Sequence, residues 1–173
     1  MKQIAEVAET GSTFEENAVL KALAVSRHLA GLILADDSGL EVNALGGAPG
    51  VLSARYAGDR ADDADKIKKL LSELANTDPQ GQRREARFRC VMAVARGGEL
   101  LGTFTGCVEG AIAPVPRGET GFGYDPVFIP RDFAQTFAEM LSKKKNQLSH
   151  RARALESALP LIREALRDDS IRF

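Results

Sequence analysis

The sequence predicts an α/β protein in which helices flank a mixed β-sheet. Three observations support this class: a capped helical pattern near the start, short apolar runs that alternate with helical periodicity, and a paired-glycine turn between two long strands. The 173 residues suffice for one domain with a sizeable core and are too few for two ordinary domains. Residues 1–173 are therefore expected to form a single domain.

The first half of the chain predicts a helix, a strand and a second helix. Residues 14–29 repeat apolar side chains at helical spacing, and Thr13 followed by Glu16 matches a capping box. Residues 32–35 form a short apolar run that is typical of a buried strand. Residues 63–75 place isoleucine and leucine side chains on one helical face.

The second half predicts a hairpin, a short strand and a long helix. A strand over residues 85–95 turns at two glycines into a strand over residues 100–108. Residues 127–129 form a short strand, and residues 143–166 follow helical spacing. Pro160 lies inside this last helix and is expected to kink it or split it in two. The apolar stripe expected to pack comprises Leu148, Leu155, Leu159, Ile162 and Leu166.

Charge and composition exclude several classes of function. The formal net charge is −1, whereas duplex-binding proteins usually carry a basic excess, so nucleic acid is not an expected partner. No apolar run approaches the length of a membrane span, and the N-terminus lacks the pattern of a secretory signal. Cys90 and Cys107 lie far apart without metal-type spacing, which predicts two reduced thiols and a cytoplasmic location.

Two adjacent carboxylates are the strongest chemical signal. Asp36 and Asp37 follow the predicted strand and precede Ser38, and ligand sites in α/β proteins favour the carboxyl ends of strands. Neighbouring carboxylates are costly unless a cation lies beside them, and Mg²⁺ is the usual cation in phosphate chemistry. An ordinary Asx-type turn explains the same residues.

Glu16 is a second candidate ligand for a metal. Its place in the capping box gives it a complete structural explanation. It would share a metal with Asp37 if the first helix began beside the end of the first strand. The sequence leaves both explanations open.

A glycine-flanked aromatic residue is the third signal. Phe122 lies between Gly121 and Gly123, where an exposed ring could stack on a planar base. Tyr124 and Asp125 follow directly. An ordinary turn that holds a core aromatic explains the pattern as well.

A basic segment near the C-terminus is the fourth signal. The lysine run that contains Lys145 is most simply a solvated helix face, but Ser149, His150 and Arg151 also lie together. Arg151 only donates hydrogen bonds, and His150 can donate as well. A ring carbonyl accepts such bonds and an exocyclic amine does not. The pair therefore favours 6-oxo purines, because a buried mismatch costs about 1–3 kcal/mol or more.

In this order and spacing, the motifs resemble the inosine/xanthosine triphosphate pyrophosphatase family. The matching segments are residues 10–18 (TGSTFEENA), 35–40 (ADDSGL), 45–50 (LGGAPG), 53–56 (SARY), 121–126 (GFGYDP), 136–140 (TFAEM) and 149–151 (SHR). They span nearly the whole chain. Agreement among signals that are individually weak makes the resemblance specific.

The resemblance implies an elongated, two-lobed α/β fold around a long mixed sheet, with the substrate cleft between the lobes and with a homodimer as the assembly. It also implies hydrolysis of purine nucleoside triphosphates, (d)ITP and XTP, to the monophosphate and pyrophosphate, which cleanses the nucleotide pool. Water would attack the α-phosphorus with Mg²⁺ assisting, and no covalent intermediate is required.

The same resemblance implies roles for individual residues. Asp37 looks like the general base and a metal ligand, with Glu16 as its metal partner and Asp36 in support. Ser38 is similar to the serine that contacts the substrate. The implied ligands of the base and neighbouring groups are Phe122, which would stack, and Gly123, Tyr124, Asp125, Lys145, His150 and Arg151.

The chain departs from the family pattern at its start. The family normally opens with a strand that ends in a Thr/Ser-Gly-Asn-x-x-Lys loop, which grips the triphosphate, and the residues before Thr10 contain no such loop. About 25–30 residues, roughly one strand and one helix, are expected to be absent. Residues 1–173 then form a shortened single domain. The alternative function is that of a catalytically impaired relative that binds nucleotides or a protein partner.

Overall fold

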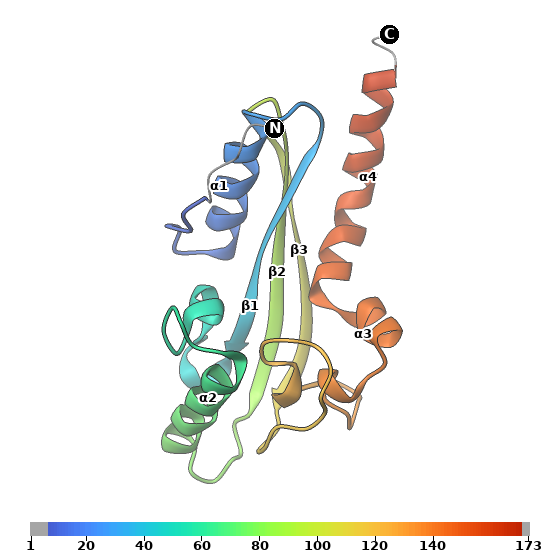
Figure 1. Ribbon diagram of the computed structural model, residues 1–173. Helices are drawn as coiled ribbons and strands as arrows, with labels where there is room; N and C mark the ends of the chain where they lie inside the picture. Colours follow the sequence, from blue (N-terminus) through green and yellow to red (C-terminus); the bar gives the residue numbers. More distant parts are fainter. Residues whose placement is uncertain (1–6, 171–173) are drawn as a thin grey trace. The chain divides into compact units, whose positions relative to one another are not determined.

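A computed structural model describes residues 7–170 of the chain. Within them, helices alternate with strands and short 3₁₀ turns. Four described strands form one antiparallel sheet in the order β1-β2-β3-β4. The expected α/β fold, with helices flanking a sheet, is therefore confirmed (Figure 1).

The element bounds follow the predicted order. The strands are β1 Ile33–Val42, β2 Glu85–Arg96, β3 Glu99–Ile112 and β4 Phe128–Pro130, and the helices are α1 Phe14–Ser26, α2 Asp63–Thr77, α3 Ser142–Leu148 and α4 His150–Ser170. Gly97 and Gly98 have φ angles of 58° and 87°, as the tight β2–β3 hairpin requires. In the antiparallel pairing of β3 with β4, Ala111 lies opposite Ile129. Within the described part of the chain, no helix has both the length and the apolar character needed to cross a membrane.

Side-chain caps start both N-terminal helices. Thr13 Oγ1 accepts a hydrogen bond from the Glu16 backbone at 3.1 Å, and Asp62 accepts one from the first turn of α2 at 2.9 Å. Helix α1 ends at Ser26, three residues before the predicted end. The Ser26 hydroxyl donates to the Leu23 carbonyl at 3.2 Å, a local bond of the kind that competes with continued helix.

Strand β1 is the main difference from the sequence-based expectation. A strand over residues 32–35 followed by a turn was predicted, but β1 continues to Val42 and contains both aspartates in its interior. The explanation by an ordinary turn is therefore wrong. Leu40 and Val42 are fully buried and hold the strand in place, so tertiary packing overrides the turn preference of Asp and Gly. Gly39 fits because a Cβ there would lie 2.3 Å from Ser53 Oγ.

The C-terminal helical segment is divided in two, but not at the predicted residue. Ser149 has extended backbone angles (φ −63°, ψ 150°) and separates α3 from α4, whereas Pro160 lies within α4. The expectation that Pro160 splits the helix is wrong. Pro160 is exposed, so water can bind the carbonyl that loses its helical donor. The buried face of α4 presents Ala154 and Ala158, and Leu155 of the expected stripe is 41% exposed.

The chain divides into two compact units. The first contains the chain up to Asp37, residues Cys90–Gly106, and the chain from Arg151 onward; the second contains Ser38–Arg89 and Cys107–His150. In the first unit, α1 and α4 lie on opposite sides of the strands (Figure 1). Their buried faces are built largely from small side chains, among them Ala18, Ala22, Ala154 and Ala158.

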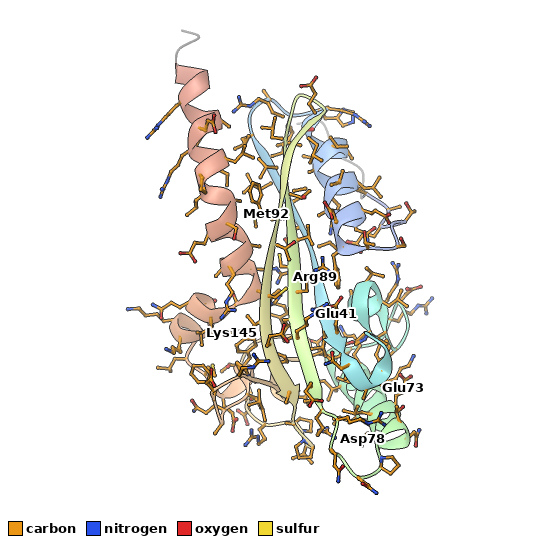
Figure 2. The ribbon with its side chains drawn as sticks, turned by 180° about the vertical axis from the view of Figure 1, so that it is seen from behind. Glu41, Glu73, Asp78, Arg89, Met92 and Lys145 are labelled. Carbon is orange, nitrogen blue, oxygen red and sulfur yellow. The ribbon has the colours of Figure 1, made fainter. Side chains whose placement is uncertain are left out.

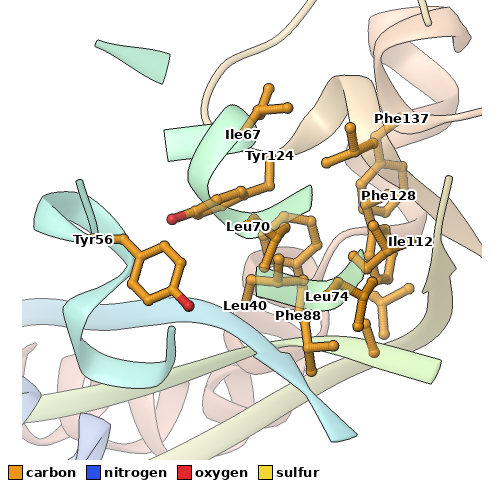
Figure 3. Close-up of a cluster of buried hydrophobic side chains, with 14 of the residues drawn as sticks. Leu40, Tyr56, Ile67, Leu70, Leu74, Phe88, Ile112, Tyr124, Phe128 and Phe137 are labelled. Atoms are coloured by element: carbon orange, nitrogen blue, oxygen red, sulfur yellow. The ribbon is translucent and has the colours of Figure 1, made fainter. Parts of the chain in front are cut away.

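The second unit contains a cluster of larger apolar side chains (Figure 3). Leu70 and Leu74 of α2 are fully buried against Leu40 of β1, which confirms the predicted apolar face of that helix. The rings of Phe88 and Phe128 meet edge-on, with their centroids 4.6 Å apart. Strands β1 and β2 also carry an ion pair between Glu41 and Arg89 at 4.0 Å, both labelled in Figure 2.

Candidate active site

Asp36 and Asp37 are neighbours in β1, so their side chains lie on opposite faces of the strand. Asp37 contacts α1: Asn17 Nδ2 donates to Oδ2 at 3.1 Å, and Lys21 Nζ lies 3.2 Å from Oδ1. Asp36 contacts α4 instead, because Arg151 Nε donates to its Oδ2 at 2.9 Å. The two carboxylates that were expected to share a cation therefore have different partners.

The ammonium group of Lys21 bridges two carboxylates. It donates to Glu9 Oε1 at 2.9 Å as well as to Asp37. Asn17 is fixed in turn, since its Oδ1 accepts a hydrogen bond from the Gly11 backbone at 2.8 Å. Asn17 and Lys21 are one helical turn apart and face the same strand residue. We name this group of four residues, Glu9, Asn17, Lys21 and Asp37, the carboxylate centre.

Burial dominates the electrostatics of Asp37, whose exposed fraction is 8%. It raises the pKa of the carboxyl, because the charged form loses its hydration, although the bond from Asn17 and the charge of Lys21 act in the opposite direction. Burial also acts to lower the pKa of Lys21, but its contacts with Glu9 and Asp37 outweigh this and raise it. The centre thus keeps a charged ammonium beside a carboxylate with increased proton affinity.

Glu16 lies outside this group. Its carboxylate accepts hydrogen bonds from the Ser12 backbone at 2.6 Å and from the Ser12 hydroxyl at 2.9 Å. The hydroxyl bond contributes most to lowering the pKa of Glu16. These are the contacts of a residue that organises a helix start. Sequence reasoning missed Glu9, Asn17 and Lys21; the four-residue spacing of the last two was the available signal, and Glu9 carried none.

In the second unit, an exposed aromatic ring lies beside a lysine. Phe122 is 62% exposed, so its explanation as a core aromatic is excluded. Lys145, on α3 (Figure 2), has its Nζ 4.6 Å from the Phe122 ring centroid and forms an ion pair with Asp125. The same Asp125 oxygen accepts from the Phe122 backbone at 2.8 Å. Gly121 has a φ of 86°, and a Cβ there would lie 2.2 Å from that oxygen, so this position requires glycine.

Gly123 and Tyr124 anchor the same loop to the unit. The Gly123 backbone donates to Asp63 Oδ2 at 2.5 Å, and the Tyr124 hydroxyl donates to the Ser53 carbonyl at 3.0 Å. Burial raises the pKa of Tyr124, so its hydroxyl stays protonated. Ser38 is half-buried in β1 and belongs to this unit.

His150 begins α4 and lies flat against Phe88. The ring centroids are 4.9 Å apart and the planes differ by 9°. Phe88 also packs on Phe137, and Lys145 Nζ is 5.9 Å from the Phe137 centroid. The predicted base ligands His150 and Lys145 therefore lie against one aromatic cluster. We name the group Phe88, Phe122, Asp125, Phe137, Lys145 and His150 the aromatic–basic centre.

The fold and these two groups define the class: an α/β protein with a carboxylate centre around a cation and an aromatic–basic centre. Among residues 7–170, no group of three or more His, Cys, Asp or Glu side chains gathers as a metal site. Two carboxylates around one cation suit Mg²⁺, which proteins usually hold through one or two carboxylates together with phosphate oxygens of the substrate.

Comparison with known proteins identifies the family. The Ham1 family model matches residues 1–161. The dITP/XTP pyrophosphatase of Bacillus subtilis is 53% identical over 157 residues, which cover 91% of this chain and 78% of that protein. The dITP/XTP pyrophosphatase of Geobacillus kaustophilus is 57% identical over 150 residues, or 87% of this chain and 72% of that protein.

Solved structures of Ham1 proteins are similar to this chain. A HAM1 protein from Coxiella burnetii has a TM-score of 0.87 and 44% identity, with 94% of this chain and 82% of that chain covered. The Ham1 protein of Staphylococcus aureus has a TM-score of 0.84 and 44% identity, with 92% and 81% covered. The chain belongs to the Ham1 family.

Proposed function

We propose that this chain hydrolyses deaminated purine nucleoside triphosphates, dITP, ITP and XTP among them, to the monophosphate and pyrophosphate, and so cleanses the nucleotide pool. The observation that carries the proposal is the 53% identity, over 91% of the chain, to a protein named dITP/XTP pyrophosphatase. The chemistry of the two centres supports the same reaction.

In the carboxylate centre, Glu9 and Asp37 would hold Mg²⁺. Their oxygens already share one cation, the Lys21 ammonium, at 2.9 and 3.2 Å, which supports this assignment. The metal would offset the negative charge that develops on the leaving pyrophosphate. We propose Glu9 as the metal partner of Asp37 and keep Glu16 as the alternative that the resemblance implies; one Glu16 oxygen, Oε2, already accepts both hydrogen bonds from Ser12.

Asp37 would also orient the attacking water and accept its proton on a carboxylate oxygen. Asn17 would fix the plane of that carboxylate through its bond to Oδ2. Lys21 would place a positive charge near the phosphates. The reaction would be one displacement at the α-phosphorus, with pyrophosphate as the leaving group and no covalent intermediate.

In the aromatic–basic centre, Phe122 would stack on the purine ring, which its exposure and its glycine neighbours permit. His150 would donate to the keto oxygen of a 6-oxo purine, and Lys145, held by Asp125, would bind a neighbouring acceptor. The remaining proposed substrate ligands are Ser38, Gly123, Tyr124, Asp125 and Arg151, with Asp36 holding the Arg151 guanidinium.

Pyrophosphate release from dITP, XTP and dATP tests this proposal. With Mg²⁺ present, turnover should be fast on dITP and XTP and slow on dATP, and EDTA should abolish it. Asp37→Asn should lower kcat by about 10²–10⁴-fold, the usual contribution of a positioned base. Equal rates on all three triphosphates, or full activity in EDTA, would contradict the proposal.

Glu9 and Glu16 form a matched pair for the metal assignment. Glu9→Gln should raise the Mg²⁺ concentration that gives half-maximal rate, and Glu16→Gln should leave it unchanged, because Glu9 shares a cation with Asp37 and Glu16 instead bonds to Ser12. If Glu16→Gln raised this Mg²⁺ concentration and Glu9→Gln did not, Glu16 would be the metal partner.

We further propose that the protein works in the cytoplasm as a homodimer. Cys90 and Cys107 are both in the reduced form, which suits a reducing compartment. The dimer follows from the resemblance to the family alone. Light scattering on the full chain should give twice its mass of 18.6 kDa, and a single species of 18.6 kDa would refute the dimer.

A further inference from the structure

We infer that Phe88 is a positioning residue for His150 and that it sets the preference for 6-oxo over 6-amino purines. The inference rests on the proposed function, in which the imidazole donates to the keto oxygen of the base. It adds a residue of β2 that would not touch the substrate and would act only through the ring that does.

The flat contact between the two rings is the first step. The Phe88 and His150 centroids lie 4.9 Å apart at an interplanar angle of 9°, and both side chains are buried. The torsion that turns an imidazole about its Cβ–Cγ bond has broad minima, so the histidine backbone alone does not fix the plane of the ring. A parallel ring on one face restricts that rotation. Phe88 therefore sets the plane in which the ring nitrogens lie.

The second step is that Phe88 is itself immobilised. Its ring meets Phe128 edge-on at 4.6 Å and lies 6.0 Å from Phe137 at an angle of 23° (Figure 3). Phe128 and Phe137 are 5.2 Å apart, so the three rings contact one another pairwise. Phe128 and Phe137 are fully buried. The plane of His150, at the start of α4, is therefore fixed by a packed core.

The third step links His150 to the other cationic group of the aromatic–basic centre. Lys145 Nζ lies 5.9 Å from the centroid of Phe137, a member of the same cluster, and is held by Asp125. Both donors are thus held against one rigid set of rings. A site that discriminates between a carbonyl and an amine at one ring position needs its donor fixed closely, and supporting residues provide this.

Phe88→Leu is the direct test, because it keeps an apolar side chain but removes the flat face. We expect KM for dITP to rise roughly three- to tenfold with kcat little changed, which is the size of a lost ring–ring contact. The dITP/dATP ratio of kcat/KM should fall by the same factor. Phe128→Leu is the matched comparison, because it makes the same change in a ring that supports Phe88 without facing His150 in the flat stack, and the ratio should fall by less than in Phe88→Leu. Phe88→Tyr retains the flat ring face and should keep the wild-type dITP/dATP ratio.

Proton NMR of the imidazoles tests the positioning without activity. The chain has two histidines, and His28 is exposed, so His28→Gln assigns the His150 signals. Stacking on Phe88 should shift the His150 ring protons upfield of those of His28. The shift should persist in Phe128→Leu and Phe88→Tyr and collapse in Phe88→Leu.

The outcomes separate the two proposals. If wild-type protein hydrolyses dITP and dATP equally, the proposed function fails, while the NMR shifts still decide whether Phe88 orients His150. An unchanged ratio in folded Phe88→Leu, or an equal loss in Phe128→Leu, would overturn the role of Phe88. If Phe88→Leu does not fold, the wild-type and Phe88→Tyr spectra decide, and the absence of an upfield His150 shift in either would refute the positioning.

Discussion

The proposed roles of the two adjacent aspartates of β1 depend on the residues that each contacts, because the two side chains are of the same type. Asp36 and Asp37 are chemically identical, but one meets a guanidinium from α4 and the other meets an ammonium and an amide from α1. Asp37 shares its cation, Lys21, with a second carboxylate, that of Glu9. The difference in proposed role follows from these contacts.

Replacing Lys21 tests the cation bridge. Lys21→Met leaves Glu9 and Asp37 as like charges without the cation between them, which should raise the pKa of Asp37 further. It also removes the positive charge that is proposed to lie near the phosphates. We expect kcat/KM for dITP to fall by about tenfold or more. Lys68→Met, at an exposed position of α2, is the control and should match wild type. Wild-type kinetics in Lys21→Met would argue against the bridge.

The thiols offer a prediction about pH. Burial, with the charge of Asp36 adding to it and that of Arg151 opposing it, raises the pKa of the Cys90 thiol to about 12. At pH 8 only about one Cys90 in ten thousand is then a thiolate. Iodoacetamide followed by mass spectrometry should therefore label half-buried Cys107 first and Cys90 only in denaturant. Rapid labelling of Cys90 in folded Cys107→Ser would contradict the burial.

The raised pKa of Cys90 also predicts how the free energy of unfolding changes with pH. A raised folded-state pKa means that the unfolded chain loses its Cys90 proton first, so the stabilisation is complete below the ordinary thiol value of about 8.5. It should decline as pH rises from there toward 12. Cys90→Ala should flatten this decline in urea titrations, and an unchanged slope would count against it.

At the scale of elements, local signals placed most helices and strands. Asp62 caps α2 through a bond to the backbone of Asp65, and this cap is a clear target. Asp62→Ala should lower the free energy of unfolding by about 1 kcal/mol. Asp59→Ala, at an exposed position just before the helix, should change it little. Urea denaturation measures the free energy of unfolding of both variants. Equal losses in the two would show that the Asp62 cap does not stabilise α2.

The elements that sequence predicted well are those whose pattern is local. The leucine spacing of α2 and the paired glycines after β2 needed no distant partner to be interpreted. The predicted length of β1 was wrong because residues 36–39 favour turns locally. The burial of Leu40 and Val42, which depends on distant partners, keeps these residues in the strand. The break at Ser149 had no sequence signal comparable with that of Pro160.

The candidate site was predictable to the same degree. The glycines around Phe122 were compatible with an exposed ring and with a core aromatic in an ordinary turn, and the structure shows that the ring is exposed. Glu9 and Lys21 were not found, because what joins them to Asp37 is the packing of α1 on β1 and not a sequence motif. The stacking of His150 on Phe88 likewise joins residues far apart in the chain.

At the scale of the whole molecule, the two units differ in what they bury. The second unit buries leucines and phenylalanines such as Leu70, Leu74 and Phe128, whereas α4 of the first unit buries Ala154 and Ala158. The first unit also exposes many large apolar side chains, namely Leu20, Leu29, Leu34, Leu100, Leu101, Leu155 and Leu166. A buried CH₂ group contributes about 0.8 kcal/mol, so the alanine faces contribute less.

This contrast predicts unequal local stability. Amides of α4 should exchange with solvent through openings of lower free energy than amides of α2, because α2 loses two buried leucines when it opens. Hydrogen exchange in low urea, read by mass spectrometry, measures both helices in one sample. Equal protection of α2 and α4 would show that burial of these side chains does not govern local opening.

The alternation of side chains along β1 constrains how this segment can change in length. A deletion or insertion of one residue between Ile33 and Asp36 would move every following side chain to the other face of the strand. Asp37 would then turn toward the Arg151 side, and the Lys21 side would receive a different residue. A point substitution near these aspartates therefore keeps the facing of the other side chains, whereas an insertion or deletion of one residue does not.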